Sequence, residues 1–340
     1  MSQTTVLGAG MMGAATASHL ARRGHQVNLW GTELDEKIIS LLRESREHKT
    51  LGVTLPESIL FFQAQELEKA LDNAEVVVIA VVSHAVAKIV QRAALFFKRG
   101  ITVINVAKGI PPSPYLTLTQ LIKDKIFPRA AESIQVVGMG GPARASELVR
   151  AVPTAVIFGV REKEAASFCS HIFSNSDLRA SVTDDVIGVE LCAAMKNAYA
   201  IIVGICQGSD RGMDNTRAAF ITQAIGEMTR IVTLKGGKVE TVSGLAGVGD
   251  LYVTVQGGRN GAFGALLGQG MTVDEALKQM ENQTIEGYAT TAGISRLVGE
   301  LEREGKLNLR QDLPLFNLLY ALLYQAKPAQ QVIKDYWKNS

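Results

Sequence analysis

The stretch Thr4-Thr5-Val6-Leu7-Gly8-Ala9-Gly10-Met11-Met12-Gly13 decides the fold of this chain. A short β-branched run precedes three glycines spaced G-x-G-x-x-G, and an alanine-rich helical pattern over residues 12–23 follows them. In this setting Gly8 permits a tight turn, Gly10 lets a pyrophosphate approach the backbone, and Gly13 lets the helix pack closely on the strand. The alternative is a glycine-rich turn without a ligand. The strand before and the helix after favour a dinucleotide-binding loop.

The first half of the chain alternates short apolar runs with helical segments, which is typical of a parallel sheet with crossover helices. We predict a Rossmann-type, doubly wound and mainly parallel sheet in a dinucleotide-binding domain over residues 1–185. The near-continuous hydrophobicity of the strands indicates that both faces of the sheet are covered. The expected strands are residues 4–7, 26–30, 76–82, 101–106, 134–137 and 154–158, with helices at 12–23, 85–97 and 162–173.

Strand patterns end near Asp184, and long helical patterns replace them. We predict an all-α domain over residues 186–340 that binds the substrate and forms a dimer face, for which the apolar stretch 313–323 is the candidate. Two glycine-rich segments, 244–250 and 257–264, are expected to be connections that place substrate groups. The expected helices are residues 186–206, 215–235, 273–281, 290–304 and 313–324.

Composition narrows the classes of partner. The chain has 340 residues, a net charge of +2, 47% hydrophobic and 20% charged residues, which gives no reason to expect nucleic acid. Its three cysteines lack a Cys-x-x-Cys spacing, which fits a reducing cytoplasm. The apolar segment 186–206 contains Glu190, Lys196 and Asn197, so we expect a buried helix and no membrane span. No cluster has metal-ligand spacing, and we expect no metal.

Lys196 and Asp250 are the candidate catalytic residues. Lys196 lies in an apolar helical pattern, where a buried lysine is costly and tends to be functional; the alternative is a lysine that extends to solvent from a helix with one wet edge. Asp250 follows a glycine-rich turn, where it could also be only a helix N-cap. These residues alone leave both alternatives open.

Three other segments are candidate ligand sites. Arg259 and Asn260 lie among glycines, which suits a guanidinium fork on a phosphate, although an exposed loop arginine fits the same pattern. Lys108 and Gly141 each follow a predicted strand, so both are expected at the carboxyl edge of the sheet, where ligands bind.

The residues that follow the second predicted strand do not decide whether the protein prefers NAD or NADP. Glu33 comes two or three residues late for an acid that grips the ribose. Arg43, Arg46 and His48, further on, could receive a 2′-phosphate or form a solvated helix face. We expect NAD(P)(H) as the cofactor, with a slight preference for NADP.

The ordered set of motifs resembles the NAD(P)-dependent sn-glycerol-3-phosphate dehydrogenases, within the 6-phosphogluconate-dehydrogenase-like group. The resemblance runs from residue 4 to about residue 330. Its motifs are Gly8-Ala-Gly-Met-Met-Gly13, Val27-Asn-Leu-Trp30-Gly, Val82-Ser-His84, Ala107-Lys108-Gly109, Gly141-Pro142, Met195-Lys196-Asn197, Leu245-Ala-Gly-Val-Gly-Asp250-Leu, Arg259-Asn260 and Ile285-Glu286-Gly287-Tyr288.

The resemblance implies the reversible NAD(P)H-dependent reduction of dihydroxyacetone phosphate to sn-glycerol 3-phosphate, feeding glycerophospholipid synthesis, by a cytoplasmic homodimer. It makes Lys196 the catalytic lysine, with Asp250 beside it in the active site. It assigns the substrate to Lys108, Gly141, Lys196, Asn197, Asp250, Thr254, Arg259 and Asn260, and the cofactor to Gly8, Gly10, Met11, Met12, Gly13, Lys108, Arg259 and Glu286.

This chain departs from the family pattern at four positions: Gly140, Ala143, Gly258 and Gly261 stand where many relatives carry Ser, Ser or Thr, Ser and Arg. Backbone N–H groups could replace the lost contacts, because glycine allows close approach. Two alternatives remain open at this point: a reductase of another small 2-oxo or hydroxy compound, such as ketopantoate, and a cofactor-binding sensor that does not catalyse.

Overall fold

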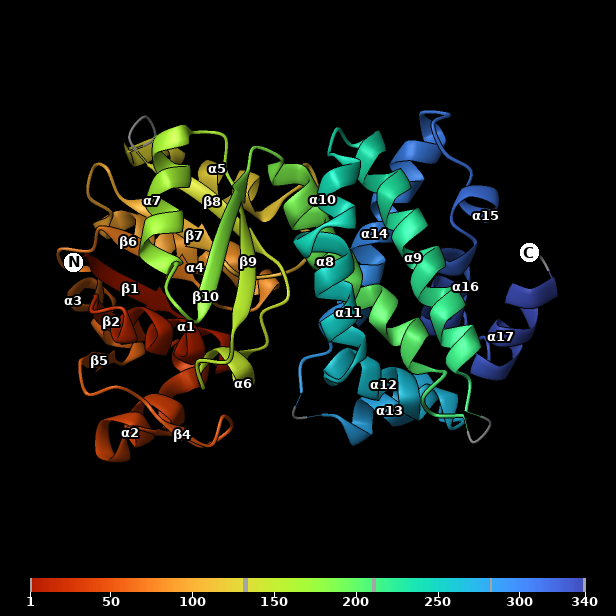
Figure 1. The fold of residues 1–340 in the computed structure, drawn as a ribbon, viewed down its shortest axis with the longest axis horizontal. Coiled ribbons are helices and arrows are strands. Elements are labelled where there is room, and N and C mark those ends of the chain that lie inside the picture. Colours follow the sequence, from red (N-terminus) through yellow and green to blue (C-terminus); the bar gives the residue numbers. More distant parts are fainter. Residues whose placement is uncertain (1, 131–133, 210–211, 282, 339–340) are drawn as a thin grey trace. The chain divides into compact units, whose positions relative to one another are not determined.

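The computed structural model describes residues 2–130, 134–209, 212–281 and 283–338. It divides into two compact units, Met1–Val186 and Ile187–Ser340 (Figure 1). Each unit has buried apolar residues of its own.

Unit 1 contains an eight-stranded sheet in the order β10-β9-β8-β7-β6-β1-β2-β5. Every neighbouring pair is parallel except β8 with β9, which is antiparallel. The mainly parallel, doubly wound fold is therefore confirmed. The strands are β1 (Gln3–Leu7), β2 (Gln26–Trp30), β5 (Ile59–Phe62), β6 (Val76–Ile79), β7 (Thr102–Asn105), β8 (Gln135–Gly140), β9 (Thr154–Gly159) and β10 (Leu178–Thr183).

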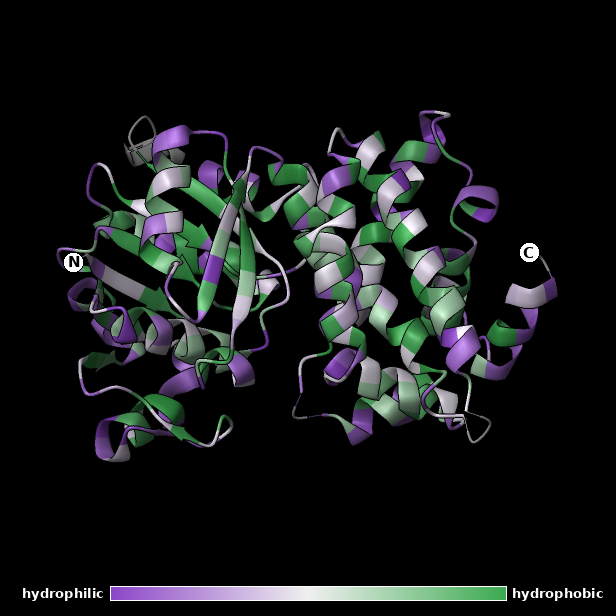
Figure 2. Ribbon diagram, in the orientation of Figure 1, coloured by the Kyte–Doolittle hydropathy of each residue, from purple (hydrophilic) through white to green (hydrophobic). Residues whose placement is uncertain are grey.

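Neighbouring residues of a strand point to opposite sides of the sheet, and apolar clusters cover both faces. Val6 belongs to one apolar cluster and Leu7 to another. The strands are mostly green in Figure 2, whereas the helices around them carry purple segments. The helices of unit 1 are α1 (Met11–Arg22), α2 (Glu36–Ser45), α3 (Leu67–Leu71), α4 (Val86–Ala93), α5 (Leu118–Ala130), α6 (Ala145–Leu148) and α7 (Lys163–Phe173).

The sequence patterns missed the two outermost strands of the sheet, β5 and β10, and a small hairpin of β3 (Glu47–His48) and β4 (Val53–Thr54). An edge strand has one neighbour, so part of it is exposed, and in β10 (Leu178–Thr183) polar residues interrupt the apolar pattern. Leu60 in β5 and Val182 in β10 are exposed, at 59% and 44%.

Unit 2 consists of helices in the part of the chain that the structure describes, as predicted. The segments 244–250 and 257–264 were expected to be connections. The first is instead a π-helical turn that leads into a helix at Asp250, and in the second a helix begins at Arg259. The helices are α8 (Val186–Gly204), α9 (Asp214–Leu234), α10 (Val239–Ser243), the π-helical turn η6 (Leu245–Gly249), α11 (Asp250–Val255), α12 (Arg259–Gly268), α13 (Val273–Gln279), α14 (Glu286–Arg303), α15 (Leu309–Asp312), α16 (Pro314–Tyr324) and α17 (Ala329–Lys338).

Two apolar helices of this unit bear on the sequence predictions. Helix α8 is long and apolar enough to cross a membrane, and 89% of its most apolar window is buried inside the protein, as in the core helix of a soluble fold. The stretch 313–323 was predicted as a dimer face. In α16 the side chains of Leu315, Phe316, Leu319 and Leu322 are instead buried within the chain, so this prediction is wrong for those residues.

Candidate functional site

The glycine loop between β1 and α1 has the shape that the sequence predicts. Gly8 has a φ of +111°, and a Cβ there would lie 2.7 Å from the Ala80 carbonyl oxygen. A Cβ on Gly13 would lie 1.9 Å from the Gly8 oxygen, so helix and loop touch there. A Cβ on Gly10 would meet no atom within 4 Å. The loop is therefore tight at Gly8 and Gly13 and open at Gly10.

The open side of the loop suits a pyrophosphate. Gly10 is the N-cap of α1 and offers no side-chain cap, and Met11 and Met12 form the first turn. The N–H groups of that turn and the helix dipole favour an anion at this end of α1. The residues present thus fit the pyrophosphate of a dinucleotide.

Asp35 is a feature of this region that the sequence patterns did not single out. It lies in the 3₁₀ turn η1 (Glu33–Asp35), and its Oδ2 accepts hydrogen bonds from Thr32 N at 2.9 Å and Ala9 N at 3.4 Å. Its carboxylate therefore touches the glycine loop. The signal that could have found it is the capping-box spacing Thr32-x-x-Asp35 directly after a predicted strand.

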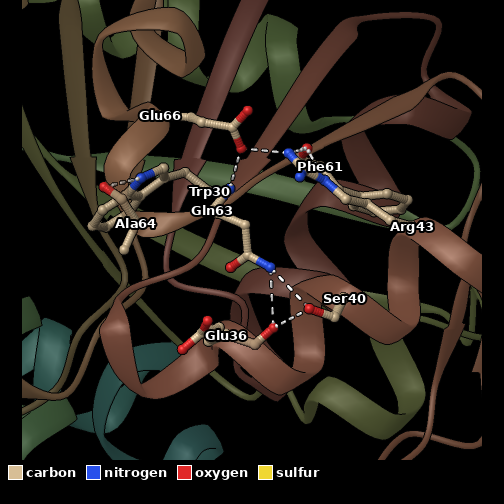
Figure 3. Close-up of polar contacts among 8 residues, drawn as sticks. All are labelled: Trp30, Glu36, Ser40, Arg43, Phe61, Gln63, Ala64 and Glu66. Atoms are coloured by element: carbon tan, nitrogen blue, oxygen red, sulfur yellow. Dashed lines mark hydrogen bonds and ion pairs between the residues drawn. The ribbon is translucent and has the colours of Figure 1, made fainter.

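Glu33, Arg43 and Arg46 are engaged within the protein. Glu33 is paired with Arg92 at 2.6 Å. Arg43 donates to the Phe61 carbonyl and to Glu66, as Figure 3 shows, and Arg46 donates to the Ile59 carbonyl at 2.8 Å. Both arginines thus bind carbonyls of the edge strand β5. The Arg43 side chain is still 42% exposed, so a contact of these arginines with a 2′-phosphate stays a prediction.

His48, the third residue of that group, is also an internal residue. It is 2% exposed, and its Nε2 lies 3.1 Å from the Ala9 carbonyl oxygen. The imidazole therefore supports the back of the glycine loop.

Lys108 and Gly141 follow β7 and β8, as expected. Gly141 has a φ of +104°, and a Cβ there would come within 3.1 Å of Val156 Cα in the antiparallel neighbour β9. Glycine at this position is therefore explained by the backbone and by packing, and a ligand contact through Gly141 stays a prediction.

In unit 2, Lys196 of α8 and Asp250 of α11 form a buried ion pair. Their side chains are 8% and 1% exposed, and Lys196 Nζ also donates to Thr254 Oγ1 at 2.9 Å. Lys196 therefore does not extend to solvent. Asp250 is the first residue of α11, where Gly249 is the N-cap, so it is not a simple helix cap.

Asn260 links three helices. Its Nδ2 donates to Asn197 Oδ1 at 3.1 Å, and its Oδ1 accepts from Gly287 N at 2.9 Å. Asn260 is 5% exposed. It thereby joins the first turn of α12 to α8 and to the start of α14.

Arg259 and Glu286 are the first residues of α12 and α14, and they form an ion pair at 2.6 Å. Gly258, the N-cap of α12, gives no side-chain cap, so the N–H groups of the first turn are available to a ligand. Cβ atoms on Gly258 and Gly261 would each lie 3.9 Å from the Thr254 carbonyl oxygen. The start of α12 therefore lies beside Thr254, whose hydroxyl accepts a hydrogen bond from Lys196.

Comparison with known proteins decides the family. Residues 3–166 match the model of the NAD-dependent glycerol-3-phosphate dehydrogenase N-terminus, and residues 185–334 match that of its C-terminus. The chain belongs to the NAD-dependent glycerol-3-phosphate dehydrogenase family. It is 33% identical to the NADP(+)-dependent glycerol-3-phosphate dehydrogenase of Archaeoglobus fulgidus, over 97% of each chain. It is 35% identical to the NAD(P)+ glycerol-3-phosphate dehydrogenase of Agathobacter rectalis, over 98% of this chain and 95% of that one.

Solved structures agree with this family. The glycerol-3-phosphate dehydrogenase of Coxiella burnetii matches with a TM-score of 0.87 and 29% identity over 99% of both chains. A ketopantoate reductase from Ralstonia eutropha matches with a TM-score of 0.57 at 12% identity, which shows a shared fold alone. The family resemblance seen in the sequence motifs is confirmed.

Proposed function

We propose that this NAD(P)-dependent oxidoreductase catalyses the reversible reduction of dihydroxyacetone phosphate to sn-glycerol 3-phosphate. Family membership over both units supports the reaction class. The observation that carries the substrate is in unit 2, where the buried pair of Lys196 and Asp250 lies beside Thr254 and the uncapped start of α12. One group for proton transfer and one site for a phosphate are what this substrate requires.

Lys196 is proposed to move the proton. A bound nicotinamide would supply or accept the hydride. In the reduction direction the Lys196 ammonium donates a proton from Nζ to the substrate carbonyl oxygen. In the oxidation direction the neutral amine accepts the alcohol proton. Asp250 and Thr254 hold Nζ in place, so little reorganisation is needed at reaction. A positioned acid or base of this kind supplies about 10²- to 10⁴-fold.

Arg259 and the first turn of α12 are proposed to hold the substrate phosphate. Helix N–H groups and a guanidinium fork both favour phosphate oxygens. Asn260 has both ends of its amide engaged by Asn197 and Gly287. We therefore infer that Asn260 positions this turn instead of binding the substrate through its side chain.

The cofactor is proposed to lie on the glycine loop of unit 1. The expected slight preference for NADP is supported by the name of the Archaeoglobus relative alone. Asp35 weighs against it, because a carboxylate beside the loop repels a 2′-phosphate. We therefore propose that the protein uses both cofactors. The kcat/KM values measured with NADH and with NADPH show which of the two it prefers.

The experiment is initial-rate kinetics of NADH and NADPH oxidation with dihydroxyacetone phosphate. Lys196→Ala is expected to lower kcat by at least about 10²-fold. Arg259→Ala is expected mainly to raise KM for dihydroxyacetone phosphate. Near-normal turnover of Lys196→Ala would overturn the proton-transfer role. Turnover of ketopantoate in place of dihydroxyacetone phosphate, unaffected by Arg259→Ala, would instead identify a ketopantoate-type reductase. If neither NADH nor NADPH is oxidised, the protein would be a cofactor-binding sensor.

We also propose a cytoplasmic homodimer whose product enters glycerophospholipid synthesis. The three cysteines are free and buried, which fits a reducing compartment. Light scattering of the purified chain tests the dimer, and a monomer at micromolar concentration would refute it.

A further inference from the structure

The guanidinium expected to bind the substrate phosphate is held by a carboxylate of the same chain. Arg259 Nη2 lies 2.6 Å from Glu286 Oε1, and the two side chains are 35% and 22% exposed. We propose that Glu286 determines substrate specificity: it competes for Arg259, so that a phosphate monoester dianion displaces it and a monoanionic carboxylate does not. This inference rests on the proposed function, because it concerns the same phosphate site.

The backbone keeps Glu286 next to Arg259. The hydrogen bond from Gly287 N to Asn260 Oδ1 joins the start of α14 to the first turn of α12 at 2.9 Å. A Cβ on Gly287 would lie 2.2 Å from the Asn197 carbonyl oxygen, so α14 is also packed tightly on α8. Because both helix starts are fixed, the pair can open when a ligand arrives only by rotation of its side chains.

Charge then separates the classes of ligand. A carboxylate from solution would exchange one singly charged partner of Arg259 for another and would lose its own translational freedom on binding. Glu286 is tethered in the same chain and so has a high effective concentration. It therefore stays bound to Arg259 when a free carboxylate is present. A phosphate dianion carries more charge and more acceptor oxygens, and it also reaches the N–H groups at the start of α12. The exchange therefore favours the phosphate.

The test is calorimetric titration of the cofactor-free full chain with inorganic phosphate and, separately, with glycolate at about pH 8, where phosphate is mainly dianionic. Glu286→Gln is expected to tighten phosphate binding about 3- to 10-fold, since it removes one partly exposed competing charge. The same variant is expected to bind glycolate measurably, whereas the native chain does not. With saturating cofactor, KM for dihydroxyacetone phosphate falls more than kcat changes.

Glu300→Gln is the matched control. It makes the same charge change on α14, fourteen positions and thus about 21 Å along the helix, which is beyond the screening length in about 0.1 M salt. It should leave phosphate affinity unchanged. Circular dichroism of each variant verifies the fold.

A double variant separates this inference from the proposed function. In an Arg259→Ala background, Glu286→Gln should no longer tighten phosphate binding. If Arg259→Ala weakens phosphate binding but Glu286→Gln leaves it unchanged or weaker, the competition is refuted and the proposed phosphate site stands. If Arg259→Ala does not weaken phosphate binding, the proposed phosphate site itself fails.

Discussion

The ion pair of Lys196 and Asp250 is expensive at the scale of single residues. Both side chains are almost fully buried. Removing two charges from water costs several kcal/mol per ion, and their mutual attraction often does no more than offset this cost. Such a pair is therefore weak evidence for a stabilising role, and the proposed proton transfer gives another reason for its presence.

Lys196→Met should lower the free energy of unfolding by about 3 kcal/mol, because it leaves the Asp250 carboxylate buried without its partner. Adding Asp250→Leu should restore most of that loss, while both variants stay inactive. Urea denaturation followed by circular dichroism measures the stabilities.

The control for this pair is the exposed pair of Arg230 and Asp312, whose side chains are 49% and 23% exposed. Arg230→Met should cost less than about 1 kcal/mol. A double variant at Lys196 and Asp250 as unstable as Lys196→Met alone would show that the pair contributes net stability.

At the scale of elements, α12 shows where the sequence patterns stop being informative. Its glycines led to the prediction of a connection, since glycine disfavours helix interiors. The structure gives the reason for them: a Cβ on Gly264 would lie 2.0 Å from the Ile201 oxygen of α8, and one on Gly268 2.2 Å from the Ile205 oxygen. Helix packing requires these glycines, and the partner positions lie about 60 residues away in the chain, beyond any local pattern.

Gly264→Ala should therefore destabilise unit 2, by roughly 1–3 kcal/mol as in other overpacked interiors. Gly261→Ala, on the same helix, should be tolerated or slightly stabilising, because its Cβ would meet nothing closer than the Thr254 oxygen at 3.9 Å. Thermal unfolding of both variants checks this contrast, and equal midpoints would contradict it.

The glycine loop offers a second contrast within one element. Gly13→Ala would place a Cβ 1.9 Å from the Gly8 oxygen, so it should disrupt the loop and lower the stability of unit 1. Gly10→Ala meets no atom and has φ of −66°, so it should fold normally yet weaken NADH binding about tenfold or more by obstructing the pyrophosphate. Fluorescence titration with NADH measures this, and unchanged affinity in Gly10→Ala would place the pyrophosphate elsewhere.

The residues of the candidate site were easier to predict from the sequence than the contacts that they make. Lys196 stood out because a charge in an apolar helix is unusual locally, whereas Asp250 could also be an N-cap and was singled out by the family resemblance. That Arg259 meets Glu286, and that Asp35 touches Ala9, could not be predicted, since these contacts join elements that only tertiary packing brings together. The contacts of Arg43 and Arg46 with carbonyls of β5 could not be predicted either, because the pattern of that strand was missed.

At the scale of the whole molecule, each unit contains a buried titratable group with a shifted pKa, and these two groups, His19 and Glu227, respond to pH in opposite directions. His19 of α1 lies against the Phe173 carbonyl of unit 1, and burial lowers its pKa to about 4. Glu227 of α9 accepts hydrogen bonds from Tyr199 and from the N–H groups that begin α16, and burial raises its pKa to about 7.

The sign follows from proton binding in the two states. Between about pH 6.5 and 4 the unfolded His19 binds a proton that the folded one does not, so unit 1 loses stability as the pH falls. Between about pH 4.5 and 7 the folded Glu227 keeps a proton that the unfolded one has lost, so unit 2 loses stability as the pH rises. Each effect amounts to at most about 3 kcal/mol.

As the pH is lowered from 7 to 5, the unfolding midpoint of unit 1 should therefore fall and that of unit 2 should rise. The two tryptophans allow this to be followed, since Trp30 is buried in unit 1 and Trp337 is 54% exposed in unit 2. In Trp337→Phe the remaining fluorescence reports unit 1, and calorimetry of the same protein reports both units. His19→Gln should flatten only the pH dependence of unit 1, and Glu227→Gln only that of unit 2. A single transition with one pH dependence, changed equally by both substitutions, would mean that the two units unfold as one.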